Sequence, residues 1–197
     1  MPKGERLQEL LERCGALRRG HFLLSSGLHS TAYVQCALLL EEPRRAREVG
    51  IALAAELAVT RPDSVLAPAL GGVVIGHEVA AALGVPFRFV ERDGPRMALR
   101  RGFALAAGER VVVVEDVVTT GKSTLETAAV AQSAGARVVG IGSIIDRSGG
   151  RHGFQVPYAG LLTLDLPTFA PESCPLCAEG DVAVKPGSRP GPRPDGA

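Results

Sequence analysis

Apolar residues follow two alternating patterns along the chain. Short stretches that are apolar almost throughout, such as SVLAPA (64–69), VVVV (111–114) and VVGIGSII (138–145), alternate with longer segments in which apolar residues recur at helical spacing. Continuous apolar stretches are typical of strands buried on both faces, and the longer segments are typical of helices that cover a sheet. The alternation therefore predicts an α/β fold with a central, mostly parallel sheet flanked by helices.

The same pattern gives the positions of the individual elements. Helices are expected at 5–14, 43–60, 72–84 and 121–134, and strands at 64–69, 86–91, 111–116, 136–146 and within 161–169. Between residues 20 and 43 the apolar runs are short and interrupted by Ser and Gly, which indicates strands and a turn. The charged segment 92–102 separates two of the strands.

The length and composition suit one domain. A chain of 197 residues, 46% of them hydrophobic, is long enough to bury one continuous core. We expect a single domain over 1–178, with its core at about 43–166 and a smaller part formed by about 1–42 and the C-terminal segment. Residues 179–197 are rich in Pro, Gly and charge, which predicts a largely disordered tail.

The charge balance argues against polyanionic macromolecules as partners. The chain has 22 basic and 21 acidic residues, so no strong field attracts nucleic acid or an anionic membrane surface. No apolar run approaches the ~20 residues of a membrane span, and the first residues, MPKGERLQELLERCG, lack the apolar core of a signal peptide. We therefore expect a cytoplasmic protein that binds neither nucleic acid nor membrane.

The segment VVVVEDVVTTGKST (111–124) carries the strongest chemical signal. Its end matches a nucleotide-binding P-loop, but the first glycine of that motif would fall at Asp116, where a carboxylate would repel phosphate. A P-loop kinase is therefore excluded. Instead, Glu115 and Asp116 stand at the carboxyl end of a buried strand, and TTGKST begins the next helix. In open α/β sheets, ligands bind at this edge.

Two kinds of ligand group suit this arrangement. The amides and hydroxyls of residues 119–124 lie at the positive end of a helix, which favours a phosphate monoester. The adjacent carboxylates favour sugar hydroxyls or a divalent cation. A ribose 5-phosphate satisfies both requirements. The alternative is purely structural, a strand that ends in two solvated acids and is followed by an N-capping threonine.

The same segment resembles a known family. VVVVEDVVTTGKS is similar to the phosphoribosyl-pyrophosphate motif of the type I phosphoribosyltransferases, in the form found in orotate phosphoribosyltransferases. HFLLSSGLHSTAYVQCALLL resembles their amino-terminal hood, APALGGVVIGHEVA their pyrophosphate loop and following helix, and IIDRSGG their base-contacting strand end. CPLCAEGDVAVKPGSR resembles the C-terminal tail of one bacterial branch. These matches occur in the family's order over about residues 20–150, so the resemblance is specific.

The resemblance implies roles for residues along the expected sheet edge. Glu115 and Asp116 would hold the ribose hydroxyls. The phosphate-binding residues would be Thr119, Thr120, Gly121, Lys122 and Ser123, and the pyrophosphate loop Ala69, Leu70, Gly71 and Gly72. Many relatives have lysine where this chain has Gly71, so pyrophosphate contact here would be through the backbone. The structural alternative is a strand-to-helix turn that uses glycine for geometry.

Other implied contacts concern the base. Arg147 would pair with the carboxylate of orotate, which requires a planar two-pronged donor. An ordinary surface arginine is the alternative. Ser25, Ser26 and Tyr33 match hood positions near the base or its entrance, although Ser25 replaces the lysine of many relatives.

The segment ERDGPRMALRRGF (91–103) stands where the family has its mobile catalytic loop. It is shorter and contains no lysine, so Arg92, and after it Arg96, are the candidates to stabilise charge on the departing pyrophosphate. A solvated basic hairpin is the structural alternative. In the family this loop reaches into the neighbouring subunit, which implies a homodimer.

The implied reaction joins orotate to phosphoribosyl pyrophosphate and yields orotidine 5-phosphate and pyrophosphate, a step of pyrimidine (UMP) biosynthesis. It implies Mg²⁺, held mainly by the substrate rather than by protein ligands. A purine phosphoribosyltransferase would use the same sugar-phosphate site, but a purine offers no carboxylate to Arg147. A non-enzymatic regulator of this fold would need an additional DNA-binding domain or a strongly basic face.

Cys174 and Cys177 form a C-x2-C pair. Such a pair can hold Zn²⁺, but a structural site needs two more ligands, and only Cys14, Cys36 and four histidines without metal-ligand spacing are available. A reduced pair or a disulfide remains as the alternative to Zn²⁺.

Overall fold

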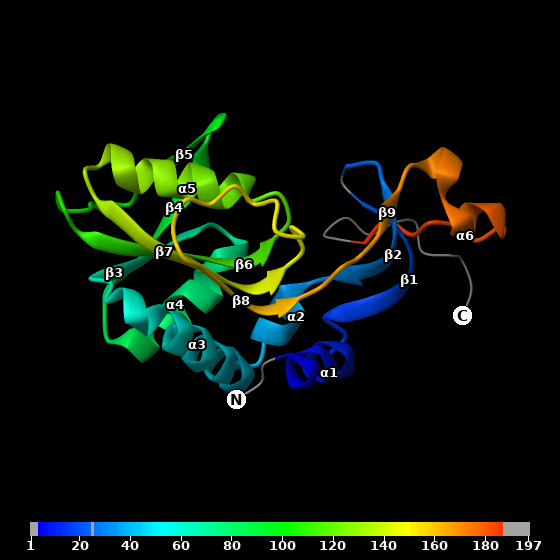
Figure 1. Cartoon of the computed structure of the whole chain (residues 1–197), viewed down its shortest axis with the longest axis horizontal. Coiled ribbons are helices and arrows are strands. Elements are labelled where there is room, and N and C mark those ends of the chain that lie inside the picture. Colours follow the sequence, from blue (N-terminus) through cyan, green and yellow to red (C-terminus); the bar gives the residue numbers. More distant parts are fainter. Residues whose placement is uncertain (1–3, 25, 187–197) are drawn as a thin grey trace.

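A computed structural model describes residues 4–24 and 26–186 of the chain. Its larger sheet has six strands in the order β5-β4-β3-β6-β7-β8 (Figure 1). All neighbouring strands are parallel except β4 and β5, which confirms the predicted mostly parallel sheet. The bounds are β3 Ser64–Pro68, β4 Phe87–Asp93, β5 Arg96–Leu99, β6 Arg110–Val118, β7 Arg137–Asp146 and β8 Tyr158–Thr163.

Helices cover both faces of this sheet. Helices α3 (Pro43–Leu57) and α4 (Gly71–Leu83) pack on one face, and α5 (Lys122–Ser133) packs on the other (Figure 1). The valines of β6 from 111 to 114 are completely buried between these layers. Burial on both faces explains why β6 is continuously apolar, and it makes the end of β6 the first place where this strand carries polar side chains.

A smaller antiparallel sheet forms the hood. It consists of β1 (Leu17–Leu23), β2 (His29–Val34) and β9 (Thr168–Phe169). Helix α1 (Glu5–Arg13) precedes β1, and helix α2 (Cys36–Leu40) connects β2 to the core. The five parallel strands of the larger sheet point their carboxyl ends toward this hood (Figure 1). The predicted strand within 161–169 is divided, because β8 ends in the core sheet and β9 joins the hood. Helix α2 was not predicted, since CALLL is too short to show helical periodicity.

The C-terminal segment differs in part from the predicted disordered tail. After η2 (Pro171–Ser173) and α6 (Pro175–Ala178), the chain returns to the hood, where Val184 N donates to His21 O at 2.8 Å. Leu23 N donates in turn to Val184 O at 2.9 Å. Backbone pairing therefore fixes residues around 184, and the rest of the predicted tail, 187–197, lies outside the described residues.

The segment expected to be a catalytic loop is a β-hairpin. Strands β4 and β5 pair from Val90↔Leu99 to Asp93↔Arg96, so only Gly94 and Pro95 remain for the turn. Arg101 donates twice to the Glu91 carboxylate, at 2.7 and 2.8 Å, and this closes the base of the hairpin. The segment is thus regular structure rather than an irregular loop.

None of the helices within 4–24 and 26–186 has both the length and the apolar character that crossing a membrane requires.

Candidate active site

Two acidic side chains mark the carboxyl end of β6. The Glu115 side chain is buried, and both of its oxygens are bound within the protein. Ser123 Oγ donates to Oε2 at 2.9 Å, and the Asp116 amide donates to Oε1 at 3.2 Å. Asp116 uses Oδ1 for the Val117 amide at 2.8 Å. Glu115 therefore ties the strand end to the first turn of α5, while Asp116 is the carboxylate with capacity left for a ligand.

The position of this pair makes ionisation costly. Burial, followed by the charge of Asp116, raises the pKa of Glu115 to about 8. Burial also raises the pKa of Asp116. The second negative charge is thus disfavoured at neutral pH until a cation or additional hydrogen-bond donors arrive. This is what a site built for a cation or for sugar hydroxyls requires.

Two helices begin beside these acids, and neither N-cap residue bonds to its helix through a side chain, although the Lys122 amide of α5 donates to Thr120 Oγ1 at 3.4 Å. The first main-chain bond of α5 runs from Leu125 N to Gly121 O at 2.8 Å, so the amides before Leu125 have no partner within the helix. Helix α4 also starts without a side-chain cap. In contrast, Glu42 caps α3 by accepting from the amides of Arg44 and Arg45. The uncapped starts leave two positive helix ends open to anions.

Close packing at two glycines brings these elements together. A Cβ at Gly71 would lie 2.7 Å from Asp116 Oδ1, so the start of α4 lies directly against the acidic pair. Gly121 has φ 76°, and a Cβ there would lie 2.8 Å from His152 O. The loop after β7 thus lies over the start of α5. One edge of the sheet therefore collects two acids and two helix starts.

The remaining candidates for phosphate and pyrophosphate differ in exposure. Thr119, Thr120 and Lys122 are exposed at this edge, whereas the Ser123 hydroxyl is already bound to Glu115. In the pyrophosphate loop, Leu70 is exposed and the Ala69 amide donates to Val90 O at 2.8 Å.

Gly72 in the same loop has a packing role. A Cβ there would lie 2.9 Å from Val114 O, so glycine lets α4 approach the sheet. Glycine is therefore needed at this position for packing, whether or not a ligand binds.

Arg147 follows β7 at the same edge. Its amide donates to Val118 O at 2.8 Å, which ties it to the end of β6. Its Nε is buried without a hydrogen-bond partner, and burial lowers the pKa of the guanidinium from its usual value. No carboxylate among residues 4–24 and 26–186 forms an ion pair with it. A half-buried cation without a counter-ion is a place for an anionic ligand.

Comparison with known proteins identifies the family of this chain. The family model described as phosphoribosyl transferase domain matches residues 39–153. The orotate phosphoribosyltransferase of Thermotoga maritima is 52% identical over 93% of this chain and 98% of its own length. That of Carboxydothermus hydrogenoformans is 50% identical over 88% and 92%. The chain belongs to the orotate phosphoribosyltransferase family.

Solved structures of this family share the fold. The orotate phosphoribosyltransferase from Aeropyrum pernix superposes with a TM-score of 0.67 at 28% identity, covering 80% of this chain and 93% of that one. The Mycobacterium tuberculosis enzyme, solved with inorganic phosphate, gives 0.64 at 28% identity over 80% and 94%. Orotate phosphoribosyltransferases thus have the same core as this chain.

Not every predicted site residue lies with the acidic pair. Ser26 is exposed and accepts from the Leu28 amide at 3.4 Å. Tyr33 accepts from Gln35 Nε2 at 3.4 Å and lies beside the Phe22 ring. Their contacts in the described part of the chain are within the hood, and Ser25 lies outside the described residues.

Within one chain, the hairpin arginines are also separate from the pair. Arg92 Nη2 forms an ion pair with Glu126 on α5, and Nη1 donates to Pro95 O at 3.1 Å. Arg96 is exposed at the hairpin turn. No contact that the structure describes joins either side chain to Glu115 or Asp116.

One neighbour of the acids was missed in the sequence. The Cys36 thiol on α2 is buried, and its pKa is raised first by burial and then by the charge of Asp116. Helix α2 therefore brings the junction between hood and core close to the site. Local sequence gives no signal for this contact, because it depends on how α2 packs.

The raised pKa of Glu115 predicts a pH-dependent stability. In the unfolded chain this group titrates near 4.3, whereas in the folded protein it titrates at about 8. Between these values the folded state binds more protons, so the contribution of Glu115 to stability falls as pH rises through this window. We expect the stability of Glu115→Gln relative to the original chain to increase from pH 5 to pH 8 (~1 kcal/mol or more). Urea unfolding at several pH values measures it.

The exposed Glu172→Gln serves as a control and should follow the pH dependence of the original chain. A pH-independent difference between Glu115→Gln and the original chain would contradict the raised pKa.

Proposed function

We propose that this chain catalyses the transfer of the 5-phosphoribosyl group from phosphoribosyl pyrophosphate to orotate, giving orotidine 5-phosphate and pyrophosphate in pyrimidine (UMP) biosynthesis. One observation carries the proposal. Two helix starts without an N-cap side-chain bond flank an acidic pair at one sheet edge, and a half-buried arginine, without an ion pair among the described residues, follows the adjacent strand. A substrate with phosphate at both ends of a sugar, together with a carboxylated base, matches these groups one by one.

Each part of the site has a distinct task in this reaction. The start of α5, with Thr119, Thr120, Gly121 and Lys122, holds the 5-phosphate. Asp116 accepts hydrogen bonds from the ribose hydroxyls, and Glu115 positions α5 through Ser123. The start of α4, preceded by Ala69 and Leu70, receives the pyrophosphate through main-chain amides. The transition state gains from this fixed arrangement because its donors need no reorganisation when charge develops.

We also propose that the reaction requires Mg²⁺. The donors near the helix starts are carboxylate oxygens, which this ion prefers, and Asp116 fits better than Glu115 because both Glu115 oxygens are already bound. When bound, the ion would neutralise the diphosphate, whose own oxygens would supply most of its ligands. The raised pKa values of the two acids fit a site that gains its full charge only with such a cation.

Arg147 gives the proposal its base specificity. Its planar guanidinium can bind the orotate carboxylate through two parallel hydrogen bonds. A purine base offers no such group, so the unpaired cation favours orotate over the purine alternative.

The proposal includes a cytoplasmic homodimer. All four cysteines are free, as expected in a reducing compartment. The arginines of the β4–β5 hairpin do not contact the acids of their own chain, which suits a hairpin that serves the site of a second subunit.

Activity is tested directly by the fall in orotate absorbance with phosphoribosyl pyrophosphate and Mg²⁺. We expect turnover with orotate and none with adenine, hypoxanthine or uracil. Asp116→Asn should lower kcat/KM by ~100-fold or more with the fold intact, because it removes an acceptor of the ribose hydroxyls. The exposed Asp165→Asn should retain full activity. Full activity of Asp116→Asn would refute the site assignment.

Arg147→Gln separates binding from stability. We expect kcat/KM for orotate to fall roughly 100-fold, because the orotate carboxylate loses its partner. The free energy of unfolding of the ligand-free protein should not fall, since the charge that is removed has no partner within the chain. Kinetics and urea unfolding measure the two effects.

The exposed Arg151→Gln is the matched control on the same loop and should alter neither quantity. A loss of stability in Arg147→Gln without a change in orotate kinetics would make Arg147 a structural residue.

Two inactive variants test whether the hairpin of one subunit completes the active site of the other. Asp116→Asn and the double variant Arg92→Ala/Arg96→Ala should each be nearly inactive. Co-expression should restore about a quarter of the normal activity, because half of the dimers are mixed and each mixed dimer has one intact site. If the hairpin served its own subunit, every site would carry one defect and no activity would return.

A further inference from the structure

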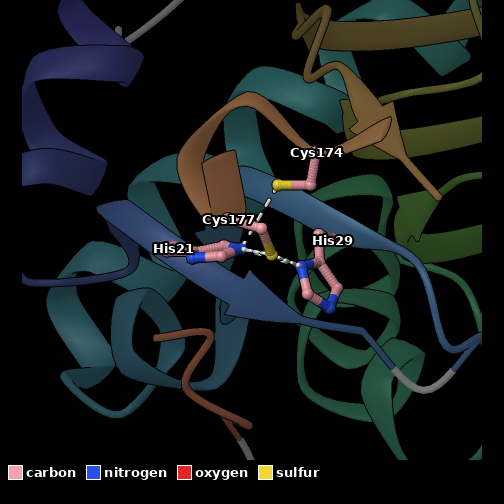
Figure 2. Close-up of side chains that lie close together, drawn as sticks. All are labelled: His21, His29, Cys174 and Cys177. Atoms are coloured by element: carbon pink, nitrogen blue, oxygen red, sulfur yellow. Dashed lines mark hydrogen bonds between the residues drawn. The ribbon is translucent and has the colours of Figure 1, made fainter. Parts of the chain in front are cut away.

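Four metal-ligand side chains meet in the hood, away from the candidate active site. His21 lies on β1, His29 begins β2, and Cys174 and Cys177 flank the start of α6 (Figure 2). One potential ligand atom from each lies within 4.8 Å of all the others. His21, His29 and Cys174 are buried, and Cys177 is more exposed. The sequence showed only the cysteine pair, because the histidines come from antiparallel strands and have no metal-binding spacing.

The protonation of His21 can be inferred from its hydrogen bonds. Its Nδ1 lies 3.1 Å from the main-chain oxygen of Asp181, which can only accept. Nδ1 therefore carries the proton, and in the neutral ring Nε2 presents a lone pair to the cluster. A ring that donates from one nitrogen to a carbonyl and points the other at its neighbours is the usual arrangement of a metal-binding histidine. The Asp181 carboxylate, 3.7 Å from Nδ1, supports the same orientation.

The distances suit a small tetrahedral site. His21 Nε2 lies 2.8 Å from His29 Nδ1, 3.3 Å from Cys174 Sγ and 3.7 Å from Cys177 Sγ. Cys177 Sγ lies 3.3 Å from His29 Nδ1. Tetrahedral zinc with ordinary bond lengths separates two nitrogens by about 3.3 Å and a nitrogen from a sulfur by about 3.6 Å. These four distances differ from the tetrahedral values by about 0.5 Å or less, and the other two pairs lie within 4.8 Å, so small side-chain adjustments would let the four atoms surround a zinc ion.

We propose that His21, His29, Cys174 and Cys177 bind one structural Zn²⁺ ion that fastens the C-terminal segment to the β1–β2 hairpin. Two thiolates balance the charge of the ion, and four protein ligands leave no position for substrate, so the site is structural rather than catalytic. The set of two cysteines and two histidines selects zinc over magnesium or calcium, which prefer oxygen. This site is independent of the Mg²⁺ proposed at the acidic pair.

The location gives the ion a mechanical task. His21 and His29 stand on either side of the hood turn that carries Ser26, and Leu23 pairs with His29 in register. The cysteines belong to the segment that continues to Val184, whose backbone is bonded to His21 and Leu23. Zinc would therefore join the β1–β2 hairpin to the C-terminal segment that carries the cysteines. Its removal should loosen the hood turn and this segment together.

The test is the metal content of the full chain. The protein is produced with zinc in the medium, purified without a metal-binding tag and dialysed against metal-free buffer. Mass spectrometry of the metals should give about one zinc per chain. Chelation should lower the thermal unfolding temperature, and growth with Co²⁺ should give the visible absorption of a tetrahedral site with thiolate ligands.

Matched variants identify the ligands. Cys174→Ser and His21→Ala should each lose at least nine-tenths of the zinc, whereas Cys14→Ser, outside the cluster, should retain it. Cys177→His replaces one zinc ligand by another and should keep most of the metal. This variant shows whether zinc loss in the other variants comes from the missing ligand or from misfolding. Two outcomes would overturn the proposal, and both begin with unsubstituted protein that contains no zinc. In the first, a thiol reagent reacts with all four cysteines of the unfolded chain. In the second, it reacts with only two, because the other two form a disulfide.

Discussion

The structure depends on the cost of placing two carboxylates at the end of a buried strand. Glu115 and Asp116 follow four completely buried valines, and their environment withholds the water that would normally stabilise their charge. The fold offsets part of this cost locally, through the Ser123 hydroxyl and the main-chain amides. The remainder must come from a ligand. The two carboxylates are only partly stabilised in the free protein, and a cation or sugar hydroxyls would supply further partners. The ligand-bound state is therefore favoured over the free state.

The parallel topology provides the positive partners of these acids. Each parallel crossover returns the chain so that a helix starts where a strand ends, and α4 and α5 both start beside the end of β6. The two helix starts and the acidic pair then alternate in charge along a single edge. Arg147 adds a positive charge to this edge, because it follows β7, the next strand in the sheet.

Sequence patterns predicted the core better than the hood. The apolar strands and the helices between them appear where periodicity placed them, since burial on two faces leaves a clear signal. Strand β4 was predicted, whereas β5 and the turn before it were assigned as a loop, because their charged residues conceal a strand at the sheet edge. The hood depends on contacts between distant segments, such as Val184 with His21. For the same reason, Cys36 beside the acids and the two histidines beside the cysteine pair could not be predicted from local spacing.

The ion pair between Arg92 and Glu126 has a consequence for the empty enzyme. The two-residue turn fixes the backbone of the hairpin, and the Arg92 side chain pairs with Glu126 on α5. To pair with another anion, the guanidinium would have to leave this partly buried glutamate. In the ligand-free chain the Glu126 carboxylate thus occupies the guanidinium, and any second anion would have to compete with it.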